Sequence, residues 1–520
     1  MSLSSRTSSG AERTLNMPHA LTLLLDSPVL IVAILISGIG GTFQYGFQIS
    51  SLNSPSTFIK ELINATCLQH HGLSLEHWQL SLIWSFIVST FCIGGLLGSL
   101  CAGRLAATYG RKRCLLLNNL VAVCGAVLMV LSKTAMSFEM ILVGRFIYGV
   151  NAGVGSVVHT MYLMECAPKR LRGMVGVSVT TFLSFGKFSG QLLGISELLG
   201  TEERWIWLLA FSGFTGLLQL LTLSFLPESP RFLLLERGDQ QGCEKAVRRL
   251  WGTSRDHKQE VEEMLVEHAA LRGVRSRGVI ELLSDRSVRW QLLTTLVSFT
   301  TLQLCGINAV YLYSFDVFRA AGIPPHQLRY ASLGTGLCEV STSLACVMVV
   351  EKTGKKILFV RGYLGMAATL ALLTLTLYLQ NYVSWMPYCS MVLIFLFIFF
   401  FSSGPAGGTA PLPGEIFPQS LKAAGFTIAW TINWVGLFLV GMVFPIIVEH
   451  LDYFCFLIFL VFCLFTGLFV WRNVPETKNR TVLEITAEFQ RIHNPAAPTM
   501  DAKADQLEAN NNHPSLSTRL

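Results

Sequence analysis

Twelve apolar stretches, each of about 20 residues, constrain the fold of this chain more than any other feature of its sequence. A helix of that length crosses the hydrocarbon core of a bilayer, which is about 30 Å thick. The stretches are continuous rather than alternating, which favours helices over the strands of a membrane barrel. They cover about 29–51, 79–102, 114–132, 139–163, 173–196, 205–226, 290–313, 328–350, 357–379, 387–410, 422–446 and 453–472. The sequence therefore predicts an all-α membrane protein with twelve transmembrane helices.

Charged residues are scarce, and their placement excludes several other classes of protein. Only 14% of the 520 residues are Asp, Glu, Lys or Arg, against about 25% in a soluble domain. The net charge is +7, but the basic residues cluster between apolar stretches, which is typical of membrane-protein loops and not of a nucleic-acid surface. The 13 cysteines form no Cys-x-x-Cys pair. We therefore expect no metal site, no cofactor, no nucleic-acid partner and no catalytic constellation.

Three motifs recur along the chain at a separation of 244 to 250 residues, each pair in the same place relative to the apolar stretches. The pairs are Gly110-Arg111-Lys112 with Gly354-Lys355-Lys356, Glu165-x-x-Pro168-x-x-x-Arg172 with Glu415-x-x-Pro418-x-x-x-Lys422, and Pro227-Glu228-Ser229 with Pro475-Glu476-Thr477. The shared order predicts two similarly oriented six-helix bundles, related by an axis along the membrane normal. The expected organisation is a tail (1–28), a bundle (29–226), a helical linker (227–289), a second bundle (290–472) and a tail (473–520).

The basic residues of the short loops predict the orientation of the chain. Eleven of them lie on one side of the expected bundle and five on the other. Since positive loops stay in the cytoplasm, we expect both tails and the linker to be cytoplasmic, in a multi-pass protein of the plasma membrane. The sequon Asn64-Ala65-Thr66 then falls in the first external loop, where Asn64 could be glycosylated.

The repeated motifs place acidic and basic residues at helix ends on the expected cytoplasmic side. Charge pairs there would join neighbouring helices, and the two bundles, in one conformation and would break when that side opens. The alternative is that these residues act only as topology signals and helix caps. The candidate gating residues are Arg111, Arg145, Glu165, Arg172, Glu228 and Arg231 in the first half and Glu351, Lys355, Glu415, Lys422 and Glu476 in the second.

Polar side chains inside the apolar stretches indicate a binding site, because a polar group in a membrane span is costly without a partner. The seventh stretch contains Gln303 and Asn308, and further amides occur in other spans. An amide offers both donors and an acceptor, which suits a neutral polyhydroxyl solute. The alternative is that these amides only join helices. The amides in the other spans are Gln44, Gln48, Gln191 and Asn433, and Trp434 adds a flat aromatic surface next to Asn433.

Two other features of the spans leave their roles open. Lys187 and Glu339 lie deep in the fifth and eighth stretches, where they could form a proton or substrate site or simply pair with neighbours. The tenth stretch contains Gly404-Pro405-Ala406-Gly407-Gly408, which predicts a bend or break in that helix. A gate and a static kink both fit that break.

Together, these motifs resemble the facilitative glucose/fructose transporters of the sugar-porter branch of the major facilitator superfamily. The resemblance covers about residues 30–485 and includes Gly144-Arg145, Pro227-Glu228-Ser229-Pro230-Arg231 and Gln303-Leu304-x-Gly306-Ile307-Asn308. It implies alternating access and uniport of a hexose. By position, the sugar would be held by Gln191, Gln303, Ile307, Asn308 and Trp434.

The chain departs from the glucose carriers of that family at several positions. Phe299-Thr300-Thr301 replace a Gln-Leu-Ser triplet, Leu302 replaces a Gln, and Glu339 replaces an Asn. These changes resemble the fructose-permissive branch. Gln48 stands where proton-coupled relatives carry an Asp, which favours a uniporter. The alternatives are a proton-coupled sugar or polyol symporter that uses Glu339, a non-transporting nutrient receptor and an organic-anion carrier.

Overall fold

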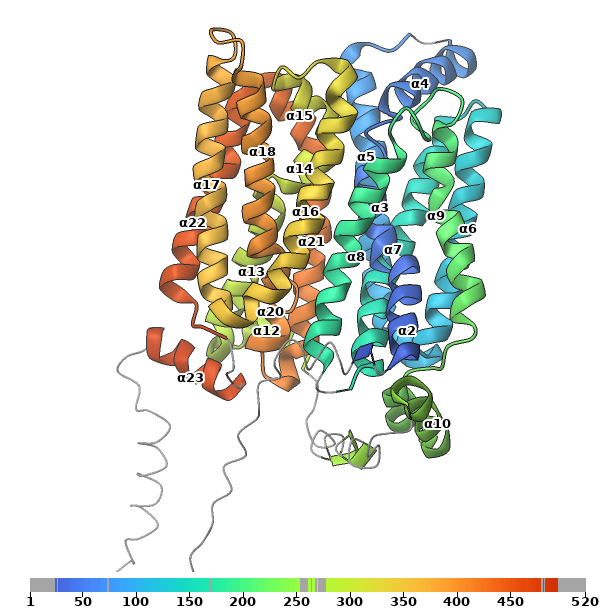
Figure 1. Cartoon of the computed structure of the whole chain (residues 1–520), viewed down its shortest axis with the longest axis vertical. Coiled ribbons are helices and arrows are strands. Elements are labelled where there is room, and N and C mark those ends of the chain that lie inside the picture. Colours follow the sequence, from blue (N-terminus) through green and yellow to red (C-terminus); the bar gives the residue numbers. More distant parts are fainter. Residues whose placement is uncertain are drawn as a thin grey trace, which may run out of the picture.

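The protein is a bundle of long helices with short helices at both ends (Figure 1). The computed structural model describes residues 24–25, 27–72, 74–168, 171–252, 261–262, 264–266, 269, 277–477, 480 and 482–493, with only the helical backbone at 71, 172–174, 176–177, 347–353, 419 and 482–483. These residues contain no strand. The predicted all-α fold is confirmed.

The first six expected spans form one half of the molecule, coloured blue to green in Figure 1. Its first span is broken at Gly41, and α4 is a short helix outside the bundle. We call this part the N half. Its helices are α2 (Pro28–Gly40), α3 (Thr42–Ser50), α4 (Ser56–His71), α5 (His77–Tyr109), α6 (Arg111–Thr134), α7 (Phe138–Cys166), α8 (Arg172–Leu193) and α9 (Trp205–Leu223).

The last six expected spans form the other half, coloured yellow to red in Figure 1, which we call the C half. The seventh and tenth spans are broken, the tenth at the predicted Gly404. The helices are α13 (Arg289–Leu304), α14 (Ile307–Leu312), α15 (Ser314–Ala320), α16 (Leu328–Thr353), α17 (Lys355–Leu379), α18 (Met386–Ser403), α19 (Pro405–Thr409), α20 (Leu412–Ile416), α21 (Gln419–Leu451) and α22 (Cys455–Asn473).

Short helices mark the two ends of the bundle. Helix α4 lies at one end, which we call the α4 side, and the described linker and C-terminal helices lie at the other, which we call the linker side (Figure 1). The helices on the linker side are η2 (Phe232–Glu236), α10 (Gln240–Trp251), α12 (Val279–Ser284) and α23 (Val482–His493). Helix α10 is attached to the N half through Trp251, whose indole Nε1 donates to the carbonyl oxygen of Cys166 at 2.8 Å.

Nine helical stretches among the described residues are long and apolar enough to cross a membrane. One of them, Ser420–Asn473, covers both the eleventh and the twelfth expected spans. The two expected spans outside these nine are α8 and α16, which contain the charged residues Lys187 and Glu339. Each of the twelve expected spans thus coincides with a helix or a broken helix.

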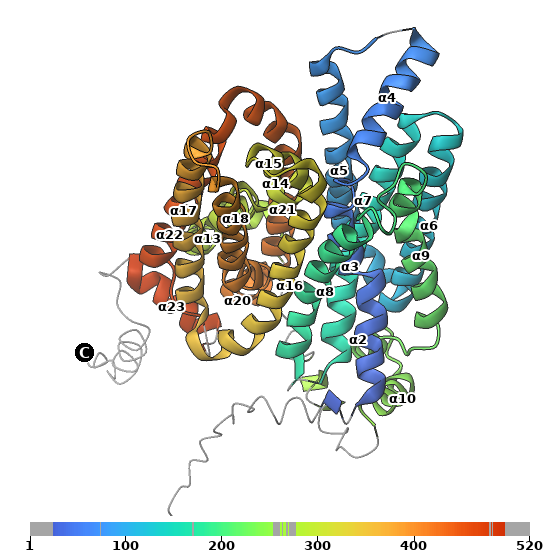
Figure 2. The ribbon, with the colours of Figure 1, turned by 45° about the horizontal axis from the view of Figure 1, so that its top comes forward.

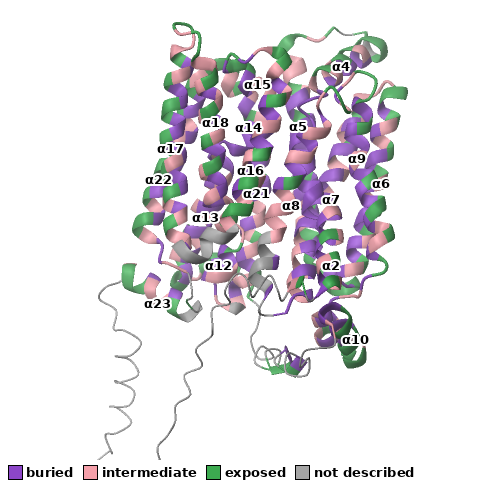
Figure 3. Ribbon diagram, in the orientation of Figure 1, coloured by how far each residue is buried: buried purple, intermediate pink, exposed green. Residues whose placement is uncertain are grey.

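Buried residues lie mainly on the helix faces that point into the bundle (Figure 3). An added Cβ at Gly46 of α3 would lie 1.9 Å from the carbonyl oxygen of Leu183 on α8, so only glycine permits this close approach. The outer faces of the bundle expose large apolar side chains such as Phe214 and Phe225. Lipid is the medium that covers such a surface.

The two halves lie side by side and contact each other through several pairs of elements (Figure 2). Helix α8 packs against α16, α5 packs against α21, and α3 packs against α14. Residues from both halves therefore line one central interface, and this interface contains most of the polar side chains predicted from the sequence.

Candidate functional site

The break between α13 and α14 brings the two amides of the seventh span together. Gly306 has φ +92°, a left-handed conformation that glycine adopts readily. Across this break, Asn308 Nδ2 donates to Gln303 Oε1 at 2.6 Å. Gln303 Nε2 in turn donates to Asn433 Oδ1 of α21 at 2.7 Å. We call Gln303, Asn308 and Asn433 the amide cluster.

Trp434 extends from the C half into the N half beside the amide cluster. Its side chain is fully buried, and its indole Nε1 donates to Ser99 Oγ of α5 at 2.7 Å. The Trp434 ring lies 4.9 Å from the ring of Tyr45 on α3. An added Cβ at Gly95 would lie 2.4 Å from the Trp434 ring, so a larger residue there would displace the indole.

Gln191 crosses the interface in the opposite direction. Its Nε2 donates to Thr335 Oγ1 of α16 at 2.9 Å, while its Oε1 is buried without a hydrogen-bond partner. A buried acceptor left unpaired costs about 1–3 kcal/mol. Of the five predicted sugar contacts, Gln303 and Asn308 touch each other, and their neighbour Ile307 is fully buried. Gln191 and Trp434 contact other residues of the interface.

Lys187 and Glu339, whose roles the sequence left open, form an ion pair across the two halves. Lys187 Nζ lies 3.0 and 3.2 Å from the two carboxylate oxygens of Glu339. The side chains are 4% and 2% exposed. Ser184 Oγ also donates to Glu339 Oε1 at 3.0 Å, and the Tyr311 ring centroid lies 4.3 Å from the Lys187 nitrogen. Sequence spacing could not reveal a contact between residues 152 positions apart.

Arg145 was predicted among the gating charges of the cytoplasmic side, and that placement is wrong. Helix α7 begins on the α4 side, so Arg145 lies in the interior of the N half, completely buried. Its guanidinium donates to Gln48 Oε1 at 2.9 Å, to the Gln48 carbonyl at 3.0 Å and to the Val88 carbonyl at 3.1 Å. Arg145 lies near the start of the fourth span, and this span starts on the side opposite the other gating candidates.

The other described gating candidates do lie on the linker side, where matched pairs occur in the two halves. Arg111 binds Glu165 at 2.9 Å and Glu236 at 2.6 Å. In the C half, Lys355 binds Glu415 at the corresponding position. Ser229 also donates to Glu165. Arg111–Glu165 and Lys355–Glu415 connect helices within one half, and Arg111–Glu236 connects the N half to η2.

Two carboxylates cap helices in the repeated motifs. Glu228 Oε1 accepts from the Lys112 backbone N–H at 2.9 Å, at the start of α6. Glu476 Oε1 accepts from the Lys355 backbone N–H at 3.0 Å, at the start of α17. An anion at a helix N-terminus satisfies the free N–H groups there. Glu228 and Glu476 therefore have the cap role that the sequence left as an alternative.

The remaining gating candidates are less fully described. The side chains of Arg172 and Glu351 lie outside the described residues. Arg231 directly precedes η2, and Lys422 lies in the first turn of α21, both on the linker side. The predicted ion pairs between the two halves do not occur among the described linker-side pairs. Arg111–Glu165 and Lys355–Glu415 each lie within one half, and Arg111–Glu236 joins the N half to the linker helix η2.

Hydrogen bonds also close the two halves against each other on the α4 side. Asn53 Nδ2 donates to the Tyr311 carbonyl at 2.6 Å, and Asn53 Oδ1 accepts from the Ser314 N–H at 2.9 Å. Nearer the surface, the hydroxyl of Tyr330 donates to the carboxylate of Glu197. These hydrogen bonds join the two halves between the amide cluster and the α4 side.

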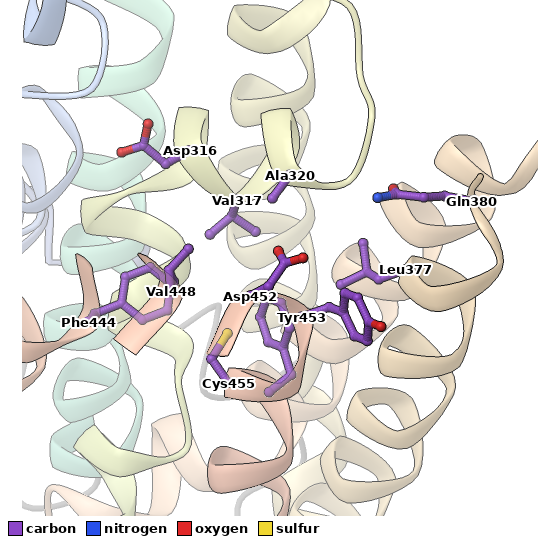
Figure 4. A pocket seen from close by; sticks show the side chains of 11 residues that line it. Asp316, Val317, Ala320, Leu377, Gln380, Phe444, Val448, Asp452, Tyr453 and Cys455 are labelled. Atoms are coloured by element: carbon purple, nitrogen blue, oxygen red, sulfur yellow. The ribbon is translucent and has the colours of Figure 1, made fainter. Parts of the chain in front are cut away.

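A small cavity near the α4 side of the C half is not the substrate site. It lies between α15, α17, α21 and α22 and is lined by residues that include Asp316 and Asp452 (Figure 4). Its volume is about 20 Å³, which is room for about one water molecule. Among the described residues, no group of three or more His, Cys, Asp or Glu side chains could hold a metal ion.

The fold and the amide-lined interface between two similar bundles define a transporter of the major facilitator type. Residues 33–489 match the family model described as "Sugar (and other) transporter". The chain therefore belongs to the sugar transporter family, whose members are transporters and not enzymes.

Curated relatives match nearly the whole chain. It is 42% identical over 481 residues to the human facilitated glucose transporter member 11 of solute carrier family 2, covering 92% of this chain and 96% of the relative. It is 41% identical over 479 residues to mouse member 9, covering 92% and 89%. It is 39% identical over 467 residues to bovine member 5, covering 90% and 93%.

Solved structures confirm the fold. The proton:xylose symporter XylE, in a structure with 6-bromo-6-deoxy-D-glucose, has a TM-score of 0.71 at 22% identity, covering 89% of this chain and 99% of that chain. The inward-open conformation of the xylose transporter XylE from E. coli also has a TM-score of 0.71, at 21% identity, with 88% and 99% covered.

Proposed function

We propose that this protein is a facilitative transporter of hexoses, fructose or glucose, that works by alternating access. The observation that carries the proposal is the amide cluster at the interface of the two halves. In this structure the three amides hydrogen-bond to one another through Gln303. When the halves separate, the hydroxyls of a sugar can replace those bonds, since a hydroxyl both donates and accepts.

The relatives support the same substrate class. Members 5, 9 and 11 of solute carrier family 2 are named as facilitated glucose transporters. In this chain Gln191, Gln303, Ile307, Asn308 and Trp434 would contact the hexose. The buried Oε1 of Gln191 and Nδ2 of Asn433 have no hydrogen-bond partner, so one acceptor and one donor remain for a ligand.

The interior of the N half favours uniport over proton coupling. Coupling needs a side chain that binds and releases a proton near physiological pH. Arg145 binds the side-chain amide of Gln48, and an amide neither gains nor loses a proton near physiological pH. Glu339, the residue of the alternative symporter, is bonded to Lys187. We therefore expect uptake that follows the hexose gradient alone.

The proposed orientation places the linker side in the cytoplasm of a plasma-membrane protein, with both tails on that side. Helix α4 is then extracellular, and Asn64 lies exposed on it. We propose Asn64 as a glycosylation site. With this orientation, the hydrogen bonds that join the halves on the α4 side would hold the extracellular path closed.

The direct test is uptake of radiolabelled fructose and glucose by cells that express Gln303→Ala or Asn308→Ala. We expect uptake to fall about fivefold or more, since removing one partner of a buried hydrogen bond costs about 1–3 kcal/mol. Surface biotinylation would show that the variants reach the membrane. The control is Asn381→Ala, an exposed amide between α17 and α18. Wild-type uptake by both amide variants would refute the assignment.

A further inference from the structure

The ion pair of Lys187 and Glu339 is the one pair of opposite charges buried at the central interface of the described residues. Each partner comes from a different half. Burying one charge alone is far more costly than burying a bonded pair. The closed interface therefore requires that the charges buried in it balance each other, so that neither Lys187 nor Glu339 is buried without a partner.

The pair lies beside the proposed hexose path. Lys187 is one helical turn from Gln191 on α8, and Glu339 is one turn from Thr335 on α16, so the Gln191–Thr335 bond is adjacent to the ion pair. The Lys187 nitrogen also lies over the ring of Tyr311, which is on the same short helix α14 as Ile307 and Asn308. Two groups of proposed sugar contacts thus lie next to the charges.

We infer that Lys187 and Glu339 form a specificity-determining ion pair, which restricts this transporter to uncharged hexoses. The inference rests on the proposed function. With the pair formed, the interface is electroneutral, and the two halves close over a neutral sugar. A hexuronate would bring a carboxylate that competes with Glu339 for Lys187 and leaves one negative charge buried without a partner, so the halves would not close.

The inference also predicts what a single substitution does. In Glu339→Gln the cation of Lys187 has no carboxylate partner, and the carboxylate of a hexuronate can take that place. In Lys187→Gln the carboxylate of Glu339 is left alone, which rejects hexuronates further. In the double variant Lys187→Gln/Glu339→Gln, two amides face each other and the interface is neutral again.

Purified protein in liposomes provides the test, with radiolabelled fructose, glucose and glucuronate as probes. We expect wild type to carry a neutral hexose and no glucuronate. Glu339→Gln should lose about tenfold or more of hexose uptake and gain glucuronate uptake, and the double variant should recover hexose uptake. Arg319→Gln, which removes an exposed ion pair with Asp316 on α15, is the matched control. Glu339→Gln with wild-type hexose uptake and no glucuronate uptake would overturn the inference.

Hydrogen–deuterium exchange separates this inference from the proposed function, because it needs no substrate. We expect exchange to rise in α8 and α16 on the α4 side in both single variants, since the halves no longer close, and to return to wild type in the double variant. If wild type carries no hexose but the exchange pattern appears, the proposed function fails while the pair still closes the interface. Unchanged exchange in both single variants would refute the role in closure.

Discussion

The duplicated charge pairs on the linker side allow a quantitative prediction with an internal control. Arg111 and Glu165 have side chains that are 6% and 16% exposed. Removing one partner of a buried pair costs about 3–5 kcal/mol. Glu236 is 36% exposed and screened by solvent, so its bond to Arg111 adds about 0–1 kcal/mol. We therefore expect Arg111→Gln to lower the free energy of unfolding by about 3 kcal/mol.

A double-mutant cycle isolates the pair itself. The variants are Arg111→Gln, Glu165→Gln and the two combined, unfolded with SDS in mixed micelles and followed by tryptophan fluorescence. The coupling energy should be about 2–3 kcal/mol, because both charges are shielded from water. Since the pair lies within the N half, its loss should lower stability without breaking any described contact between the halves.

The corresponding pair in the C half is the control. Lys355 and Glu415 are 28% and 25% exposed, so solvent screens them more, and their coupling energy should be about 1 kcal/mol. Equal coupling energies in the two cycles would refute the reasoning from burial. A value below about 1 kcal/mol for Arg111 and Glu165 would refute it as well.

Three further predictions concern other parts of the molecule. Gly46→Ala should lower the melting temperature measured by thermal shift, because the new methyl group would lie 1.9 Å from the Leu183 carbonyl; Gly103→Ala, with no atom within 4 Å, should leave it unchanged. Gln48→Glu would place a carboxylate about 2.9 Å from the Arg145 guanidinium; an inward proton gradient should then stimulate hexose uptake, and an unresponsive variant would argue against a coupling role for this position. Burial raises the pKa of the Cys243 thiol to about 11, which leaves about one thiolate in 4,000 at pH 7.4. A maleimide should therefore label Cys243 in the folded protein far more slowly than in SDS. Peptide mass spectrometry measures the labelling.

The transmembrane architecture could be predicted because span length and motif repetition are local properties of the sequence. All twelve expected stretches coincide with helices, and Gly404 interrupts the tenth as expected. The breaks at Gly41 and Gly306 were not predicted. A glycine does not by itself specify a break. Gly306 has a left-handed conformation and packs against Phe459, and a contact with a residue so distant in sequence could not be predicted.

The partners of the polar residues were harder to predict than their identity. The sequence identified Gln303 and Asn308, but it could not show that Asn433 completes their hydrogen-bonded cluster. It also placed Arg145 with the cytoplasmic charges, although the fourth span starts on the opposite side. Contacts of this kind depend on how whole helices pack, so spacing along one helix does not reveal them. The ion pair of Lys187 and Glu339 is the clearest example.

Counterflow in liposomes that contain only the purified protein tests the central claim most directly. Vesicles loaded with unlabelled fructose or glucose are diluted into a trace of the labelled sugar, with no ion gradient. The account predicts transient accumulation of label for at least one of the two hexoses, with the same amplitude when a proton gradient is imposed. Absence of accumulation for both sugars, or accumulation only with a proton gradient, would contradict it.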